Sequence, residues 1–344
     1  MLKATASKHV LNFYTPAGTS RGYLTTKTSY IISISDTNEP DIKGTGECSL
    51  IKGLSPDPEN DFEVMLAKVC EDPAKYISTA NPDLNCYPSI RFGLETAWKD
   101  LQGGGKKILY PSDFTENRSG IPINGLIWMG SRANILQQVR MRIEEGYRCI
   151  KMKVGALDFK EEIGILKTIR QEYKNDDIVL RVDANGAFQF EKALEKLKIL
   201  SELELHSIEQ PIKPGNWELM AELCEKSPVP VALDEELFFK DAVDNKSNLL
   251  SVISPRYIIL KPSMLGGFAN SMEWIHEAEK TNSGWWITSA LESNIGLNAL
   301  AQWAFTLNNP TYHGLGTGKL FSNNFPSALE IRNGELRMIS KSAF

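Results

Sequence analysis

The chain has 344 residues, of which 42% are hydrophobic and 24% charged, the balance of an ordinary globular protein. Its 38 basic and 43 acidic residues give a net charge of −5, which argues against a nucleic-acid-binding surface. No apolar stretch is long enough for a signal peptide or a membrane span, so we expect a cytoplasmic protein without a membrane partner. The length favours one large domain with a smaller one beside it.

The N-terminal part has the pattern of an α+β unit. Residues 22–35 are rich in Thr, Tyr and Ile and predict a strand. Glycines at positions 44 and 46 break this pattern before Glu47. The spacing of apolar residues then predicts helices over 59–76 and 89–102, followed by three consecutive glycines. Strands followed by helices are typical of an α+β domain.

From about residue 120, short apolar strands alternate with amphipathic helices, which predicts repeated βα units with buried parallel strands. The strands are expected at 121–126, 149–154, 178–183, 206–210, 229–233, 256–260 and 285–289, with a weaker eighth near 312–315. Helices are expected between them, for example at 159–174, 190–203 and 268–281. Close to eight such units favour a TIM-type barrel over an open sheet.

Charged residues end five consecutive strands of this predicted barrel, one about every 25–30 residues. In chain order they are Lys153, Asp183, Glu209, Asp234 and Lys261. The active sites of such barrels lie at the carboxyl ends of the strands, so the three carboxylates should converge. Three converging carboxylates repel one another unless a cation balances them. Ligation by oxygen alone predicts Mg²⁺, with Mn²⁺ as the alternative.

The lysines flank this acidic cluster. Lys151 and Lys153 are two residues apart and point to the same side of their strand, whereas Lys261 arrives from the far side of the carboxylates. A lysine beside another lysine and a metal ion should have a lowered pKa, as a base near neutral pH requires. A single Asp or Lys at a strand end is usually a solvated loop residue, but five in consecutive units indicate a functional site.

These motifs resemble the enolase superfamily, in its muconate-lactonizing branch, over nearly the whole chain. The matching positions are the KxK at Lys151 and Lys153, Asp183 with Asn185, Glu209, Asp234 with Glu235, and Lys261. The resemblance implies an α/β fold, a (β/α)7β TIM-type barrel with an α+β capping domain. The capping domain would span 1–115, the barrel 116–315, and a C-terminal tail over 316–344 would return to the cap. It implies Asp183, Glu209 and Asp234 as metal ligands, the three lysines as catalytic residues, and Asn185 and Glu235 as their supports.

Softer features are similar to the o-succinylbenzoate synthases of that branch. They are a mobile loop near 15–25 with TSRG at 19–22, TGECSLIKGL at 45–54, SALESNIG at 289–296 and GLGTGKLFSN at 314–323. The implied reaction is the metal-dependent syn dehydration of 2-succinyl-6-hydroxy-2,4-cyclohexadiene-1-carboxylate to 2-succinylbenzoate in menaquinone synthesis. Lys153 would be the base and Lys261 would stabilise the enediolate from the opposite side. The implied contacts to this small carboxylate substrate are Arg21, Ser263, Ser289 and Ser293.

Three other readings use the same residues. An N-acylamino acid racemase or dipeptide epimerase would use Lys153 and Lys261 as opposed bases. Dipeptide epimerases of this branch usually carry Asp-x-Asp at the end of strand eight, but residues 314–318 contain no aspartate. A Schiff-base aldolase using Lys261 would leave the carboxylates without a role, and a barrel kept only for binding should have lost one of the charged residues. The sequence leaves the oligomeric state open.

Overall fold

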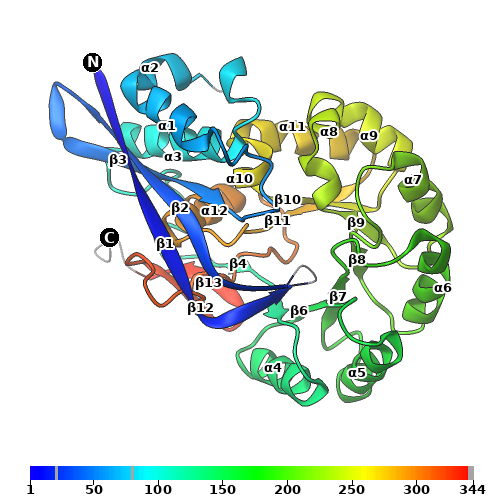
Figure 1. Cartoon of the computed structure of the whole chain (residues 1–344). Coiled ribbons are helices and arrows are strands. Elements are labelled where there is room, and N and C mark those ends of the chain that lie inside the picture. Colours follow the sequence, from blue (N-terminus) through cyan, green and yellow to red (C-terminus); the bar gives the residue numbers. More distant parts are fainter. Residues whose placement is uncertain (20–21, 79–80, 340–344) are drawn as a thin grey trace.

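The computed structural model describes residues 1–19, 22–78 and 81–339, and it has a capping domain beside a barrel of parallel strands (Figure 1). The cap contains a three-stranded antiparallel sheet in the order β1-β2-β3, with helices packed on it. Its elements are β1 (Leu2–Thr19), β2 (Gly22–Asp36), β3 (Glu39–Leu50), α1 (Phe62–Glu71), α2 (Pro73–Tyr76), the 3-10 helix η1 (Pro82–Leu84) and α3 (Pro88–Gln102). This arrangement confirms the predicted fold class.

Two local expectations for the cap were wrong. Gly44 and Gly46 do not end a strand but lie inside β3, because α3 packs directly on them. A Cβ at Gly46 would lie 1.9 Å from the carbonyl oxygen of Gly93, so only glycine permits this close approach. The helix expected over 59–76 is divided at Pro73, which begins α2, because a proline lacks the amide that a continuing helix needs.

The barrel sheet has seven parallel strands in the spatial order β11-β10-β9-β8-β7-β6-β5. They are β5 (Gly125–Ile127), β6 (Cys149–Lys153), β7 (Val179–Asp183), β8 (Ser207–Glu209), β9 (Val231–Leu233), β10 (Tyr257–Leu260) and β11 (Gly284–Ile287). The weak strand expected near 312–315 joins the two ends of this sheet. Gly314 forms a parallel bridge with Thr288 beyond β11, and His313 forms one with Ile123 ahead of β5.

Helices surround the barrel strands (Figure 1). The longer ones are α4 (Arg132–Glu144), α5 (Phe159–Glu172), α6 (Phe190–Ser201), α7 (Trp217–Lys226), α9 (Lys246–Ile253), α11 (Gly267–Lys280) and α12 (Asn294–Thr306). Short turns follow two strands directly: the 3-10 helix η2 (Glu235–Phe238) after β9 and α10 (Pro262–Leu265) after β10, with α8 (Lys240–Asp244) further on. No helix in the described ranges is both long and apolar enough to cross a membrane.

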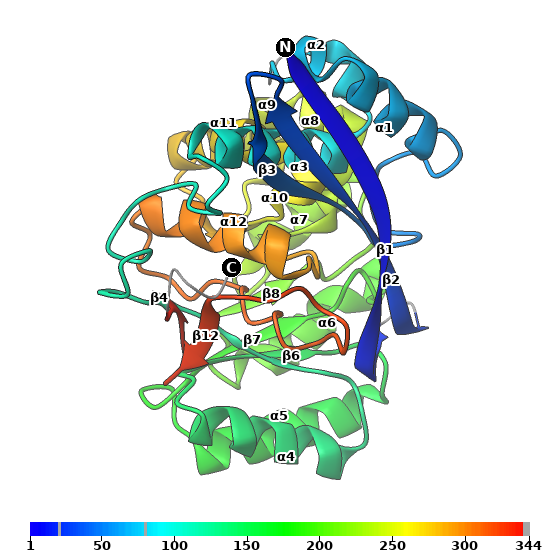
Figure 2. The ribbon, with the colours of Figure 1, turned by 90° about the vertical axis from the view of Figure 1, so that its left-hand side faces the viewer.

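The chain after the barrel forms a small sheet and also contacts the cap. The strand expected over 121–126 is split, because β4 (Ile121–Pro122) pairs with β13 (Glu335–Met338), which pairs with β12 (Leu329–Arg332). Further along the chain, the amide of Tyr14 on β1 donates to the carbonyl of Leu320 at 2.9 Å. Figure 2 shows β1 and β2 extending from the cap along this side of the barrel. The domain boundaries themselves stay predictions.

Parallel register brings the charged strand ends together. Lys153 is paired with Asp183, and Asp183 with Glu209, across β6, β7 and β8. Below them the barrel interior holds the apolar side chains of Ala232, Ile259 and Trp286 together with the buried Arg181, whose guanidinium lies 3.9 Å from the Trp286 ring centroid. The packed interior leaves the mouth of the barrel, beneath the cap, as the place for a ligand.

Candidate active site

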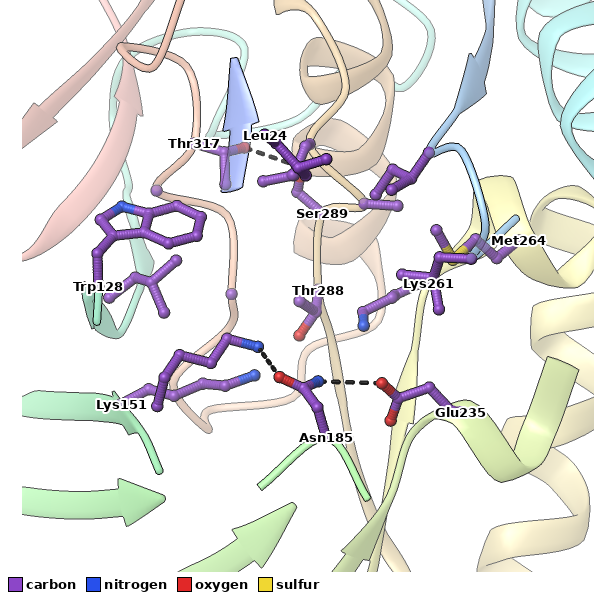
Figure 3. Close-up of a pocket in the computed structure, with 18 of the residues that line it drawn as sticks. Leu24, Trp128, Lys151, Asn185, Glu235, Lys261, Met264, Thr288, Ser289 and Thr317 are labelled. Atoms are coloured by element: carbon purple, nitrogen blue, oxygen red, sulfur yellow. Dashed lines mark hydrogen bonds between the residues drawn. The ribbon is translucent and has the colours of Figure 1, made fainter. Parts of the chain in front are cut away.

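A cavity of about 200 Å³ lies between the cap and the carboxyl ends of the barrel strands (Figure 3). The cap contributes residues 22–24, at the start of β2, and the loop residues Ile51, Lys52 and Leu54. The barrel contributes the polar side chains of Lys151, Lys153, Asn185, Glu235, Lys261 and Ser289, among others. An apolar wall comes from Leu126, Trp128, Met264 and Leu291.

The structure brings the predicted lysines and carboxylates into one cluster. The amines of Lys151 and Lys153 lie 2.9 and 2.6 Å from the same oxygen of Asp183. Lys151 also pairs with Glu209. From the opposite side, Lys261 places its amine 2.5 Å from Asp234. Figure 3 shows Lys151 and Lys261 on opposite sides of the cavity floor.

The carboxylates raise the pKa of two of these lysines, Lys151 and Lys261. Burial alone lowers the pKa of Lys151, but the charges of Asp183, Glu209 and Asp234 outweigh it and raise that pKa. The pKa of Lys261 is likewise raised, because Asp234 and Glu209 offset its burial. We expected a lowered lysine pKa beside a second lysine and a cation. For Lys151 and Lys261 the charges of the chain itself shift the pKa in the opposite direction, because each of these two amines lies against a carboxylate.

The carboxylates differ from one another. Burial would raise the pKa of Asp183, but Lys151 and Lys153 hold it below its usual value. Burial and the charge of Asp183 raise the pKa of Glu209 well above its usual value. The site thus favours the ionised form of Asp183 and disfavours the ionised form of Glu209. This difference indicates that the buried cluster has too little positive charge for all its carboxylates.

Unpaired oxygens show that this donor set fits a divalent cation. Within the described part of the chain, Oε1 of Glu209 and Oδ1 of Asp234 are buried without a hydrogen-bond partner, which is costly unless a cation or water reaches them. The described residues form no ready-made group of metal ligands, and lysine amines lie against all three carboxylates. The oxygen-only donors nevertheless suit a hard cation such as Mg²⁺.

Asn185 and Glu235 connect the two halves of the cluster. The amine of Lys153 donates to Oδ1 of Asn185 at 2.7 Å, and Nδ2 of Asn185 donates to Glu235 at 3.0 Å (Figure 3). Asn185 has φ 44, a left-handed conformation that asparagine tolerates better than most residues. Asn185 therefore contacts Lys153 directly and Glu235 contacts Asn185 in turn, while their role as supports stays a prediction.

The four residues predicted to contact substrate have different positions. Ser289 lines the cavity, and its hydroxyl accepts a hydrogen bond from Thr317 at 2.8 Å. Ser263 and Ser293 are fully buried and donate to the carboxylates of Glu292 and Glu47. Neither residue is among those that line the cavity, and their contact with substrate stays a prediction. Arg21 lies outside the described residues.

Gln210 supports the site, although we gave it no role from the sequence. Its side chain is fully buried, and its Oε1 accepts from the amides of Asp234 and Glu236, each at 3.2 Å. It therefore fixes the backbone that carries Asp234. The available signal was a polar residue directly after a strand-ending glutamate, at Glu209-Gln210.

Comparison with known proteins defines the class. Residues 134–342 match the family model described as enolase C-terminal domain-like, which is more than half of the chain. With its capped barrel and acidic strand ends, the chain belongs to the enolase superfamily. The chain is also 42% identical to the o-succinylbenzoate synthase of Desulfotalea psychrophila over 95% of this chain and 96% of that protein.

Two further comparisons give one similar solved structure and one more distant relative. The crystal structure of MenC from Desulfotalea psychrophila superimposes with a TM-score of 0.85 at 38% identity, covering 98% of this chain and 99% of that one. The N-succinyl-L-Arg/Lys racemase of Bacillus cereus is 25% identical, over 64% of this chain and 58% of that protein. The similarity to the synthase thus includes the cap as well as the barrel.

Proposed function

We propose that this chain is an o-succinylbenzoate synthase, a lyase that dehydrates 2-succinyl-6-hydroxy-2,4-cyclohexadiene-1-carboxylate to 2-succinylbenzoate in menaquinone biosynthesis. The observation that carries the proposal is the 42% identity to such a synthase over 95% of the chain. The fold and the charged strand ends are common to several activities, and selectivity is set by what surrounds them. A likeness that includes the cap therefore supports this substrate.

The lysines divide the chemistry between two faces of the substrate. Lys153, held by Asp183 and Asn185, takes the proton from the carbon next to the ring carboxylate. The same amine, now protonated, gives a proton to the hydroxyl that leaves from that face. On the opposite side the ammonium of Lys261 stabilises the negative charge that develops on the carboxylate. Lys151 adds a second positive charge beside Lys153.

Asp183, Glu209 and Asp234 would hold a divalent cation, Mg²⁺ in this proposal with Mn²⁺ as the alternative. When bound, such an ion supplies Lewis-acid polarisation of the substrate carboxylate. Asn185 and Glu235 keep Lys153 aligned with the site while the ligands are engaged. The unpaired oxygens of Glu209 and Asp234 support this assignment.

The cavity suits a molecule with a carboxylate at each end. Trp128, Leu126 and Leu24 offer apolar surface for the ring and for the methylenes of the succinyl chain. Among the described lining residues, Lys52 of the cap is the cation outside the acidic cluster, and we assign it to the succinyl carboxylate. Arg21, in the predicted mobile loop ahead of β2, stays a predicted second contact.

The opposed positions of Lys153 and Lys261 also favour racemisation of N-succinylamino acids as a second candidate. Two bases on opposite faces are what a racemase needs. The wall of the cavity at Gly314, Gly316 and Thr317 offers no carboxylate, so it has no partner for the ammonium group of a dipeptide. We therefore rank dipeptide epimerisation below racemisation of N-succinylamino acids.

The test is a direct assay of the purified protein with Mg²⁺, in which the cyclohexadiene acid and N-succinylamino acids of both configurations are supplied in parallel. We expect dehydration to exceed racemisation in kcat/KM. Racemisation without dehydration would overturn the proposal.

We propose that the protein is located in the cytoplasm. Its five cysteines are all free thiols, in keeping with a reducing compartment.

A further inference from the structure

A buried glutamate outside the acidic cluster bridges two segments that contribute to the cavity. The side chain of Glu292 is completely buried in the loop between β11 and α12. Its Oε1 accepts from the hydroxyl of Ser263, and its Oε2 accepts from the hydroxyl of Ser289, each at 2.5 Å. These lengths are typical of hydroxyls that donate to an ionised carboxylate.

The two serines belong to different parts of the proposed active site. Ser263 is the second residue after Lys261 and lies in the first turn of α10, the turn that Lys261 itself begins. Ser289 lines the cavity and accepts from Thr317, which also lines it. A single carboxylate therefore joins the segment that carries Lys261 to the end of the neighbouring strand β11, where Ser289 forms part of the cavity wall.

The cap holds the same loop from the other side. Glu47 of β3 accepts from the amide of Ser293 at 2.9 Å, from its hydroxyl at 2.5 Å, and from the amide of Gly296 at 3.0 Å. The two glutamates thus meet at the N-terminus of α12, where the helix dipole favours negative charge. A Cβ at Gly296 would lie 2.8 Å from the Cβ of Glu292 and 2.9 Å from Glu47, so glycine makes this approach possible.

One buried lysine lies beside the first of these two carboxylates, that of Glu47. The amine of Lys27 on β2 lies 3.7 Å from Glu47 and donates to Ser29, which in turn donates to Glu47 at 2.6 Å. A fully buried carboxylate is expensive to desolvate, and apolar side chains of similar volume stabilise a core more cheaply. Such a group persists where its hydrogen bonds define one geometry.

We infer that Glu292 is a positioning residue, which fixes Lys261 through Ser263 and the cavity wall through Ser289. This role rests on the function proposed above for Lys261. If the hydrogen bond between Ser263 and Glu292 is lost, the segment that carries Lys261 can move. Lys261 then stabilises the negative charge on the substrate carboxylate less well, which lowers kcat. If the hydrogen bond between Ser289 and Glu292 is lost, the cavity wall at Ser289 is held less firmly. Substrate then binds more weakly, which raises KM.

A set of variants distinguishes the effects of the Ser263–Glu292 and Ser289–Glu292 hydrogen bonds. Each variant is assayed for dehydration of the cyclohexadiene acid with Mg²⁺. We expect Ser263→Ala to lower kcat about tenfold with KM nearly unchanged, and Ser289→Ala mainly to raise KM. Glu292→Ala should show both effects, whereas Glu292→Gln, which can still bond both serines, should restore most of the activity. The double variant Ser263→Ala/Glu292→Ala should have the kcat of Glu292→Ala alone, because both remove the same contact.

Glu95→Ala is the matched control. Glu95 is a half-buried glutamate of α3 that accepts from the amide of Phe268 at 2.7 Å, so it also joins cap to barrel but does not line the cavity. We expect this variant to lose thermal stability and to keep its kcat. If Ser263→Ala and Glu292→Ala keep the wild-type kcat, or if kcat falls equally in Glu95→Ala, the positioning role is overturned.

A structural readout separates this inference from the proposed function. In crystals of Glu292→Ala we expect the contact between Lys261 and Asp234 to be lost and Ser289 to be displaced. If the variant shows these changes but the wild type does not dehydrate the acid, the proposed function is rejected and the positioning role is kept. An unchanged Lys261 and Ser289 would overturn the positioning role whatever the wild-type activity.

Discussion

At the residue scale, the site is built from side chains whose charges are set by their immediate neighbours. Asp183 accepts from two lysine amines, and Asp234 accepts from a third on the opposite side. The lysines therefore differ in the face from which they approach the cavity, although they are chemically identical. This difference predicts that they fail in different ways when they are replaced.

We expect Lys153→Ala to have no detectable dehydratase activity, because the proton and the hydroxyl leave from its face. Lys261→Arg keeps a positive charge on the other face, and because arginine stays protonated it cannot act as a base. It should retain measurable dehydration and lose solvent-deuterium exchange into the N-succinylamino acid enantiomer that Lys261 serves. Lys160→Ala, on the exposed side of α5, is the control. Dehydration by Lys153→Ala but not by Lys261→Ala would reverse the two roles.

Activity should also depend on a divalent cation. We expect EDTA to abolish turnover and Mg²⁺ or Mn²⁺ to restore it, because two carboxylate oxygens of the cluster have no hydrogen-bond partner among the described residues. Asp183→Asn should weaken Mg²⁺ binding by at least roughly tenfold in a calorimetric titration. Asp176→Asn, an exposed change in the loop before β7, should bind as the wild type does. Full activity after exhaustive chelation would reject the metal assignment.

At the scale of elements, the cap depends on the close packing of α3 on β3. Gly44 and Gly46 present bare backbone to the helix, and a Cβ at Gly46 would also lie 2.5 Å from the hydroxyl of Thr96. The close packing holds β3, and with it Glu47, at the joint between the cap and α12. A change at this contact should therefore affect the stability of the cap.

We expect Gly46→Ala to lower the free energy of unfolding by about 2–3 kcal/mol, because the added methyl group overlaps backbone that cannot move aside. Gly164→Ala in α5 is the opposite case, since its Cβ would meet only the end of the Arg132 side chain at 3.0 Å. It should stabilise the protein by up to about 1 kcal/mol, the usual gain of alanine over glycine in a helix. Urea denaturation measures both, and equal effects would contradict the packing argument.

At the scale of the whole molecule, the barrel is closed by a short segment rather than by a full strand. His313 in that segment is buried, its Nδ1 accepts from the amide of Ile287 at 3.1 Å, and its Nε2 lies 3.2 Å from the carbonyl of Asn309. Burial, aided by the charge of Arg181, lowers the pKa of His313 from 6.5 to about 4. The closed barrel therefore holds this histidine neutral.

This lowered pKa predicts a loss of stability in acid. Between pH 6.5 and about 4 the unfolded chain binds a proton at His313 that the folded chain does not, so the free energy of unfolding falls as the pH falls. The contribution is at most about 1.4 kcal/mol per pH unit. His313→Asn should make denaturation curves less dependent on pH in this window, with exposed His276→Asn as the control. The same pH dependence in His313→Asn and the wild type would reject this source.

The sequence by itself determined the class of fold and the chemistry of the site. Alternating strands and helices are local patterns, and in a parallel barrel the carboxyl ends of consecutive strands must meet at one mouth. Charged residues that end consecutive strands, such as Asp183, Glu209 and Asp234, are therefore brought together by chain order alone. The same logic placed Lys153 and Lys261 on opposite sides of them.

Only the tertiary structure decided which other residues support or line that site. Ser263 and Ser293 looked like substrate contacts in the sequence, yet packing turned both hydroxyls toward buried glutamates. The two glycines of β3 looked like breaks until the approach of α3 explained them. Glu47 and Ser293 are 246 residues apart in the chain, and their contact exists because the cap packs on the barrel. Contacts of this kind depend on how separate elements fit together, which no local pattern of residues records.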